Sequence, residues 1–349
     1  MVGRPSAWLS VLALAACACA PKGRAARDGG DIAPKAAPTG FAASEPALAA
    51  AGARPEGAGR DAPAKGGVGR ARGLLSIEDA RRYMLKLINR DRASMGLRPV
   101  ALDEGAATRA GQSHAEDMAK NGYLGHWGTD GAVPEQRYTE AGGADMVLEN
   151  ASCFTDEQKR ALDRAPRIDP KYVEQTEDMF FHEKPPHDGH RKNILEPWHK
   201  KVGIGVAQPV ATATEIPVPC FSQEFVDPYG AYAPVPRRMH VGDTLRVQGT
   251  IAGPATFAGV GLARVDAPRP IDVDELNRRR SYPVPTPYQM YWPPGYQTPI
   301  PVQVRGRAFS IDVPVSDRGK PGMYEVSVWA TMPGASDPVM VSLRTIQVR

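Results

Sequence analysis

Apolar residues recur every three or four positions in the first half of the foldable chain, which is the period of an amphipathic helix. One such stripe occupies residues 77–88, directly after Ser76, which with Asp79 three residues later forms a pair typical of a helix N-terminus. A second helix is predicted from Asp103, and a third from Asp169 with a proline at its first turn. The inward faces of these two helices are Ala107, Ala110, Gly111, His114 and Met118, and Tyr172, Val173, Thr176, Phe180 and Glu183.

Short apolar runs at residues 202–206 and 218–225 are typical of strands. Beyond Pro234 the pattern becomes an alternation of apolar and polar residues between Gly and Pro turns, which predicts half-buried strands. The alternating segments are residues 245–251, 309–315, 324–328 and 339–343. The chain therefore predicts an α+β domain over residues 73–233, followed by an all-β, Ig-like sandwich over residues 234–349.

A long insert, about residues 266–301, interrupts the predicted strands. Its aromatic residues lie among prolines and are Tyr282, Tyr288, Tyr291, Trp292 and Tyr296. Rings on a polyproline-like backbone could bind a glycan or a peptide, or they could pack the loop onto the sandwich. The sequence leaves both interpretations open.

The N-terminus reads as an export signal. Arg4 precedes an apolar stretch of about ten residues, the length of a signal-peptide core and too short to span a bilayer. The stretch ends in LAAC at Cys17, which resembles the lipobox of bacterial lipoproteins; the alternative is ordinary cleavage after Ala20. We therefore expect a signal peptide over residues 1–17, and a flexible Ala/Gly/Pro-rich tether over residues 18–72.

Composition limits the function further. The chain is 42% apolar and 23% charged, near the globular average, and its net charge of +4 is too small for a strongly basic nucleic-acid binder. It has no run of 18 apolar residues, so no transmembrane helix is expected. Only Cys153 and Cys220 of the four cysteines lie outside the signal region, and in an exported protein we expect them to pair.

Five segments together resemble the CAP superfamily, also called the SCP domain, in its bacterial branch. This superfamily includes cysteine-rich secretory proteins, antigen 5 and plant pathogenesis-related proteins. The matching segments are residues 74–126, LEN at 148–150, GHRKNIL at 189–195, VGIGVA at 202–207 and CFSQEF at 220–225. The resemblance implies an α-β-α sandwich, in which a small central sheet lies between helices.

The resemblance also implies a cleft lined by two histidines and two glutamates. Carried over to this chain, they are His126, Glu149, Glu183 and His190. Leu148 departs from the family pattern, which usually has Gly before this glutamate.

Three roles remain open for these four residues. His126 and His190 could bind a divalent ion such as Zn²⁺, with water completing its shell. A glutamate could instead orient a histidine as a general base. The four side chains could also form a polar network that only shapes the cleft.

The other histidines have simpler interpretations. His114 lies on the apolar stripe of its helix, so we expect a hydrogen-bonded core residue. His182, His187 and His199 lie among charged residues, which favours a solvated rim.

These observations indicate an exported, lipid-anchored protein of the bacterial cell envelope. Its CAP cleft is expected to bind lipid or a divalent metal without catalysis, and its partners are the membrane and an envelope lipid, glycan or peptide, with no nucleic acid. The alternatives are an envelope hydrolase for peptide or lipid that uses His126 or His190 with a glutamate, a purely structural component, or a secreted form.

If LAAC is a lipobox, the mature protein begins at an acylated Cys17. Intact-mass analysis of protein purified from membranes should show this N-terminus with its lipid. An unmodified N-terminus at Pro21 would contradict the prediction.

Overall fold

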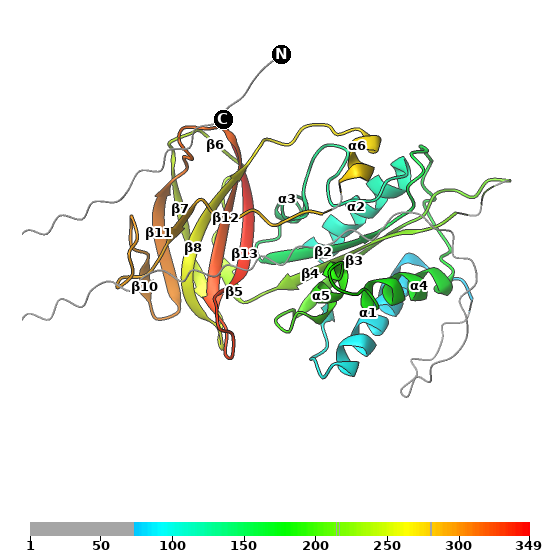
Figure 1. Cartoon of the computed structure of the whole chain (residues 1–349), viewed down its shortest axis with the longest axis horizontal. Coiled ribbons are helices and arrows are strands. Elements are labelled where there is room, and N and C mark those ends of the chain that lie inside the picture. The colour runs from blue at the N-terminus through cyan, green and yellow to red at the C-terminus, as the bar shows by residue number, and fades with distance from the viewer. Residues whose placement is uncertain (1–72, 214, 216, 280) are drawn as a thin grey trace, which may run out of the picture. The chain divides into compact units, whose positions relative to one another are not determined.

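The computed structural model describes residues 73–213, 215, 217–279 and 281–349 (Figure 1). All of them belong to a single unit of contacts. The predicted signal peptide, Cys17 and the tether lie in residues 1–72, outside the described residues. No helix of the described residues is both long and apolar enough to cross a membrane.

The described residues of the first part form five helices, of which the first, second and fourth follow the predicted stripes and the other two were not predicted. They are α1 (Ile77–Ser94), α2 (Ala106–Asn121), α3 (Pro134–Glu140), α4 (Pro170–Phe181) and α5 (Gly189–Leu195). Ser76 caps α1 by accepting a hydrogen bond from the amide of Asp79 (3.1 Å). Helix α2 begins later than predicted, because the Asp103 carboxylate accepts from the amides of Gly105 (3.2 Å) and Ala107 (3.0 Å) and forms a turn first.

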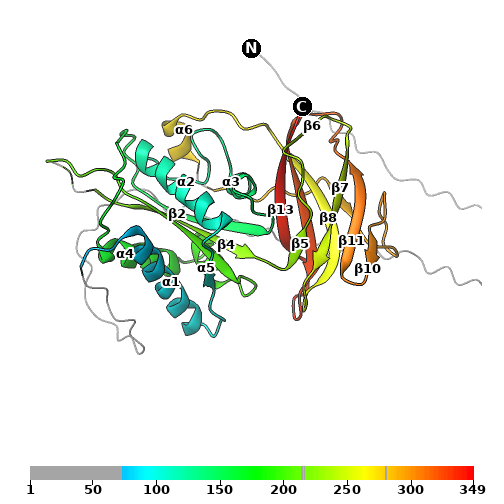
Figure 2. The same ribbon diagram turned by 180° about the vertical axis from the view of Figure 1, so that it is seen from behind.

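A small sheet lies between these helices. Its strands are β1 (Ala101–Leu102), β2 (Met146–Ser152), β3 (Lys201–Ala207) and β4 (Cys220–Asp227). Their order is β1-β3-β4-β2; β1 and β3 are parallel and the other pairs are antiparallel. Helix α2 covers one face of the sheet, and α1, α4 and α5 lie on the other (Figures 1 and 2).

Glycines allow α2 to lie directly on β3. A Cβ atom on Gly205 would lie 2.1 Å from the carbonyl oxygen of Gly111 in α2. The opposite face of the sheet buries a larger apolar cluster against α1 and α4, made of Ala80, Tyr83, Met84, Leu87, Ile88, Val100, Ile168, Val173, Phe180, Ile194, Val202, Ile204, Val206, Phe221 and Phe225. One face therefore depends on close backbone contact and the other on large side chains.

The remaining chain forms two further sheets. Their strands are β5 (Gly230–Tyr232), β6 (Arg238–Met239), β7 (Thr244–Ile251), β8 (Thr256–Val265), β9 (Gln289–Tyr291), β10 (Gln303–Arg305), β11 (Ala308–Pro314), β12 (Gly322–Thr331) and β13 (Val339–Val348). The orders are β10-β11-β7-β5 and β6-β13-β12-β8-β9, antiparallel except between β6 and β13. The predicted alternating strands are β7, β11, β12 and β13, and their inward residues share one core.

The insert at residues 266–301 packs on both parts of the chain. It contains the helix α6 (Val273–Arg278) and the strand β9. Tyr291 lies in the core of the C-terminal sheets. In contrast, Tyr282 clusters with Val133 and Trp127 of the first part, a long-range contact that the sequence does not predict.

The predicted disulfide is confirmed. Cys153 directly follows β2 and Cys220 is the first residue of β4; the two are bonded, with 4.4 Å between their Cα atoms. It therefore joins the strand that carries Glu149 to the neighbouring strand.

Removing this bond with Cys153→Ala and Cys220→Ala together should lower the free energy of unfolding by about 4 kcal/mol, because the bond closes a loop with a sequence separation of 67. Urea unfolding of the oxidised protein and the variant measures the difference. Reduced wild-type protein should behave like the variant. A difference below about 1 kcal/mol would contradict the expected loop constraint.

Candidate functional site

His126 and Glu149 form a buried pair. His126 comes from the loop after α2, and Glu149 from the middle of β2. The Nδ1 of His126 lies 2.9 Å from a Glu149 carboxylate oxygen, and the two residues are 0% and 2% exposed. The carboxylate accepts the Nδ1 proton, so Nε2 of the neutral ring carries the lone pair.

Arg137 neutralises Glu149. Its guanidinium donates to the second carboxylate oxygen (2.6 Å) and to the carbonyls of His126 (3.0 Å) and Ala132 (2.8 Å). Burial alone would raise the pKa of Glu149, but Arg137, His114 and His126 together lower it well below its usual range. Glu149 is therefore an ionised carboxylate inside the protein.

A second carboxyl group lies beside Glu149. Glu224 faces it across the β2–β4 pair and accepts a hydrogen bond from Ser222 (2.8 Å). Burial, and then the charge of Glu149, raise the pKa of Glu224 well above its usual range. The pair thus carries one negative charge, which matches the one guanidinium of Arg137.

His190 and Glu183 form the second pair. The Nδ1 of His190 in α5 lies 2.6 Å from Glu183, whose other oxygen accepts the amide of His190 (2.9 Å). The sequence places Glu183 on the inward stripe of the third helix, but α4 ends at Phe181 and Glu183 lies in the link to α5. There its carboxylate can accept from the first-turn amide of α5, which a position inside α4 would not allow.

Buried amide side chains join the two pairs. Asn150 next to Glu149 donates to the carbonyl of His190 (3.1 Å), and Asn193 of α5 donates to the carbonyl of Glu149 (3.3 Å) and to Asn150 (2.9 Å). Burial is the largest influence on the pKa of His190 and lowers it, while the hydrogen bond to Glu183 acts in the opposite direction. We call His126, Glu149, Glu183 and His190 the His–Glu cluster.

Three residues of the cluster are buried, and the side chain of Glu183 is 10% exposed. His126 and His190 are both 0% exposed; the ring of Tyr282 in the insert lies 6.4 Å from that of His126, and the ring of Phe180 lies 4.4 Å from that of His190. Within the described part of the chain, Nε2 of neither histidine has a hydrogen-bond partner. Two imidazole nitrogens, each held by a glutamate on the other ring nitrogen, are thus left free inside the protein.

The remaining histidines divide into core and surface. His114 is buried and lies 2.7 Å from the carbonyl of Gly125, which confirms the predicted core role, and burial lowers its pKa to about 4. His182 and His187 are exposed, as a rim requires. The same expectation is wrong for His199, which is 3% exposed, bonds Asp227 (2.7 Å) and stacks on Phe225; adjacent charged residues concealed this partner on β4.

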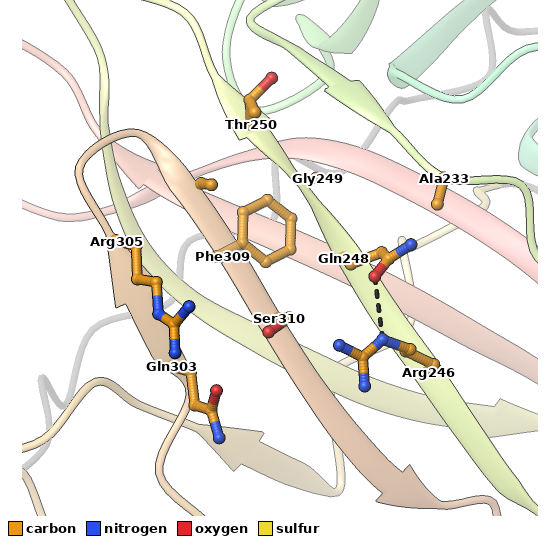
Figure 3. Close-up of a pocket in the computed structure, with 10 residues that line it drawn as sticks. Ala233, Arg246, Gln248, Gly249, Thr250, Gln303, Arg305, Phe309 and Ser310 are labelled. Carbon is orange, nitrogen blue, oxygen red and sulfur yellow. Dashed lines mark hydrogen bonds between the residues drawn. The ribbon is translucent and has the colours of Figure 1, made fainter.

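The larger hollows of the described structure lie outside the cluster. One of about 380 Å³ borders it and is lined by residues that include His114, Asp117 and Arg137. Another of about 500 Å³ lies on β7, β10 and β11, where Arg246 and Gln248 are hydrogen-bonded beside the ring of Phe309 (Figure 3). None of the residues that line this second hollow is a candidate site residue from the sequence.

The donor set for a metal ion is small. Across residues 73–349, as far as they are described, no group of three or more His, Cys, Asp or Glu side chains is placed to hold an ion. Any ion at the cluster would have His126 and His190 as its protein ligands, and water or a bound molecule would complete the shell.

Sequence reasoning missed Arg137 and Glu224. Arg137 lies in α3, a helix of seven residues that is too short to show a periodic stripe. Glu224 was visible as an acidic residue within a strand buried along its whole length, a combination that requires a partner.

The amide network extends to a fully buried acid on α4. Gln223 accepts from Asn150 (3.0 Å) and donates to Glu177 (2.7 Å). Burial raises the pKa of Glu177 to about 8. The folded protein therefore binds this proton more tightly than the unfolded chain does, and the associated stability is lost as the pH rises from about 4.5 through 8.

Glu177→Gln keeps the shape of the neutral acid and should remove this loss. Between pH 5 and 8 the unfolding free energy of wild type should fall by about 3 kcal/mol more than that of the variant. Urea unfolding across this pH range is the measurement. Asp178→Asn, next on the helix but with a side chain 70% exposed, should retain most of the wild-type slope, because the charge of Asp178 raises the pKa of Glu177 much less than burial does. Equal slopes for wild type and Glu177→Gln would show that Glu177 is ionised in the fold.

Comparisons with known proteins agree with this geometry for part of the chain. Residues 85–211 match the model of the CAP family, described as the cysteine-rich secretory protein family. No curated protein matches the sequence. Among solved structures, a chitin binding domain from Burkholderia pseudomallei is similar over 32% of this chain and 56% of its own length, so the match spans little more than half of it. Its identity of 11% and TM-score of 0.21 carry no argument.

The matched residues run from within α1 to just past β3 and include every member of the His–Glu cluster. The segments that resembled the CAP superfamily in the sequence therefore lie in one fold, closed by a disulfide that fits an extracellular protein. Residues 85–211 are therefore a CAP domain, the domain that the match describes as the cysteine-rich secretory protein family.

Proposed function

We propose that this is an exported, lipid-anchored protein of the bacterial cell envelope whose CAP domain is a non-catalytic binding module. The lipobox-like end of the signal at Cys17 supports the anchor. The C-terminal sheets, for which we propose an Ig-like sandwich, would position the CAP domain or recruit partners.

The observation that carries the binding role is the pair of free imidazole nitrogens. A buried polar atom without a partner costs about 1–3 kcal/mol, so these positions favour a bound donor or cation. In both pairs a glutamate accepts from Nδ1, which is how proteins orient histidines that ligate a metal through Nε2.

A divalent ion suits this cluster better than a lipid does. The hollow of about 380 Å³ that borders the cluster is lined mainly by polar side chains, among them Asp117, Asp130 and Arg137, and offers an acyl chain little apolar contact. A second hollow, lined in part by Met146, Leu148 and Val284, has a volume of about 100 Å³, which is room for about three water molecules. With two imidazole ligands, an ion would be held weakly and exchangeably, unlike a structural zinc with four protein ligands.

Catalysis is less well supported than binding. Either glutamate could orient its histidine as a general base. However, both Nε2 atoms are buried, and a peptide or lipid substrate would have to reach them. The alternative hydrolase therefore requires a more open arrangement than the described one.

Calorimetric titration of the full chain with Zn²⁺ tests the proposal. We expect one weak site at pH 7.5 that is lost in His126→Ala and in His190→Ala. Binding should weaken below about pH 6, because the imidazoles must be neutral to coordinate. Burial lowers the pKa of His190, so this histidine stays neutral further into the acid range than an exposed one.

His240→Ala is the matched control, since its side chain is 83% exposed and it lies among the C-terminal strands, outside the CAP domain. It should bind Zn²⁺ as wild type does. If both cluster variants retain wild-type affinity while folded, the metal role is wrong and the cluster is a structural network.

A further inference from the structure

A segment of the C-terminal insert lies on the CAP domain. We call residues 269–279 and 281–284 the strap. Ile271 and Leu276 are buried in a cluster with Met118, Tyr123 and Leu124 of the CAP domain. The amide of Leu124 donates to the side chain of Asn277 (3.1 Å), so the strap is bonded two residues before His126.

The second half of the strap lies over the residues that flank the cluster. The ring of Tyr282 packs edge-on against Trp127 (5.0 Å between centroids) and lies 6.4 Å from the ring of His126. Val284 clusters with Leu148, the residue before Glu149. The strap therefore touches the chain on both sides of the His126–Glu149 pair.

The loop that carries His126 is shaped to receive the strap. The backbone of Gly131 has φ +82°, and a Cβ atom there would lie 2.3 Å from the carbonyl oxygen of Arg269. The amide of Ile271 donates to the carbonyl of Thr129 in the same loop (2.9 Å). Any side chain at Gly131 would push the strap away.

The ion pairs of the strap lie within it. Arg269 and Arg279 both bond Glu275 (2.9 and 2.7 Å), and Arg278 bonds Asp274. Its attachment to the CAP domain is instead apolar packing, the stacking of Arg279 on Trp127 and a few hydrogen bonds. Because these charged side chains of the strap pair with one another, the strap can separate from the CAP domain without leaving an unpaired charge.

We propose that the strap is an intramolecular cover of the His–Glu cluster, which must lift from the loop around Trp127 before a ligand can reach His126. The covering itself is independent of the ligand. Only the conclusion that the strap inhibits ligand binding rests on the proposed binding function.

The contacts of Tyr282 hold the strap in place on the CAP domain. The hydroxyl of Tyr282 bonds the carboxyl of Glu135 in α3, and Glu325 of β12 interacts with the same carboxyl. Burial raises the pKa of both carboxyl groups, that of Glu325 well above its usual range. A buried, proton-bearing cluster of this kind holds the ring in one place.

Acylation of imidazoles by diethyl pyrocarbonate, localised by peptide mass spectrometry on the full chain, tests the cover. His182 and His240, with side chains 64% and 83% exposed, give the rate of open histidines. In wild type, His126 should react far more slowly than they do. In Tyr282→Ala, its rate relative to them should rise about tenfold or more, because a buried ring that holds the strap is lost.

Three controls show whether a change in the acylation rate is specific to the cover over His126. Tyr296→Ala removes a tyrosine of the same insert that lies against Trp292, and should leave His126 protected. His199, buried with Asp227, should stay unreactive in every variant unless the whole chain unfolds. If Tyr282→Ala does not fold, Tyr282→Phe, which removes only the hydroxyl bond, should still raise the rate of His126 above wild type.

The outcomes separate the strap from the proposed function. A wild-type His126 that reacts as fast as His182, or a folded Tyr282→Ala that leaves His126 as protected as before, overturns the cover. If His126 becomes reactive, the cover holds, and Zn²⁺ titration of the same variant decides the function: tighter binding than wild type supports inhibition, and no binding in either protein rejects only the metal role.

Discussion

An ionised carboxylate buried in the middle of a sheet is the constraint on which the site depends. Glu149 can keep its charge there only because Arg137 bonds it and His126 donates to it. Its neighbour Glu224 must then remain protonated, since two adjacent buried charges would repel. The position of α3, which supplies Arg137, is thus tied to the chemistry of β2.

The register of β2 follows from the same requirement. Glu149 pairs with Glu224 and Asn150 with Gln223, so alternate residues face the charged site and the amide network. A slip of one residue would exchange the two faces and leave a carboxylate without its guanidinium. Buried polar groups that are fully bonded in one register only are a way to specify that register.

The sequence predicts much of this fold and less of its site. The stripe at residues 77–88 predicts a helix and the alternation at 245–251 predicts a strand, because burial of one face gives the apolar residues of each element a characteristic spacing. The four cluster residues came from the resemblance to the CAP superfamily, since no spacing brings them together. The position of Glu183 beyond α4 was not predicted, because the link between two helices shows no periodic pattern. His199 was predicted to be exposed because its partner, Asp227, lies on a strand that is distant in the sequence.

Long-range contacts were the hardest to predict, and the strap is the clearest case. Tyr282 and Leu276 are apolar residues in a proline-rich insert, and nothing in their neighbourhood indicates which surface buries them. The sequence offered a glycan, a peptide or the sandwich as partners. Tyr291 does pack into the sandwich, and Tyr282 contacts Met323 of the sandwich, but Tyr282 also packs against the loop around Trp127 of the other folded part, which the sequence did not indicate.

The strap also limits the order in which the protein can fold during its synthesis. A chain leaves the ribosome with its N-terminus first, so the CAP elements emerge well before the segment that covers them. Leu124 must wait for Asn277, 153 residues downstream, and the apolar side chains around it lack their native cover during that interval. A chain truncated after the CAP domain would leave that apolar surface without its cover, and an exposed apolar surface favours association between chains.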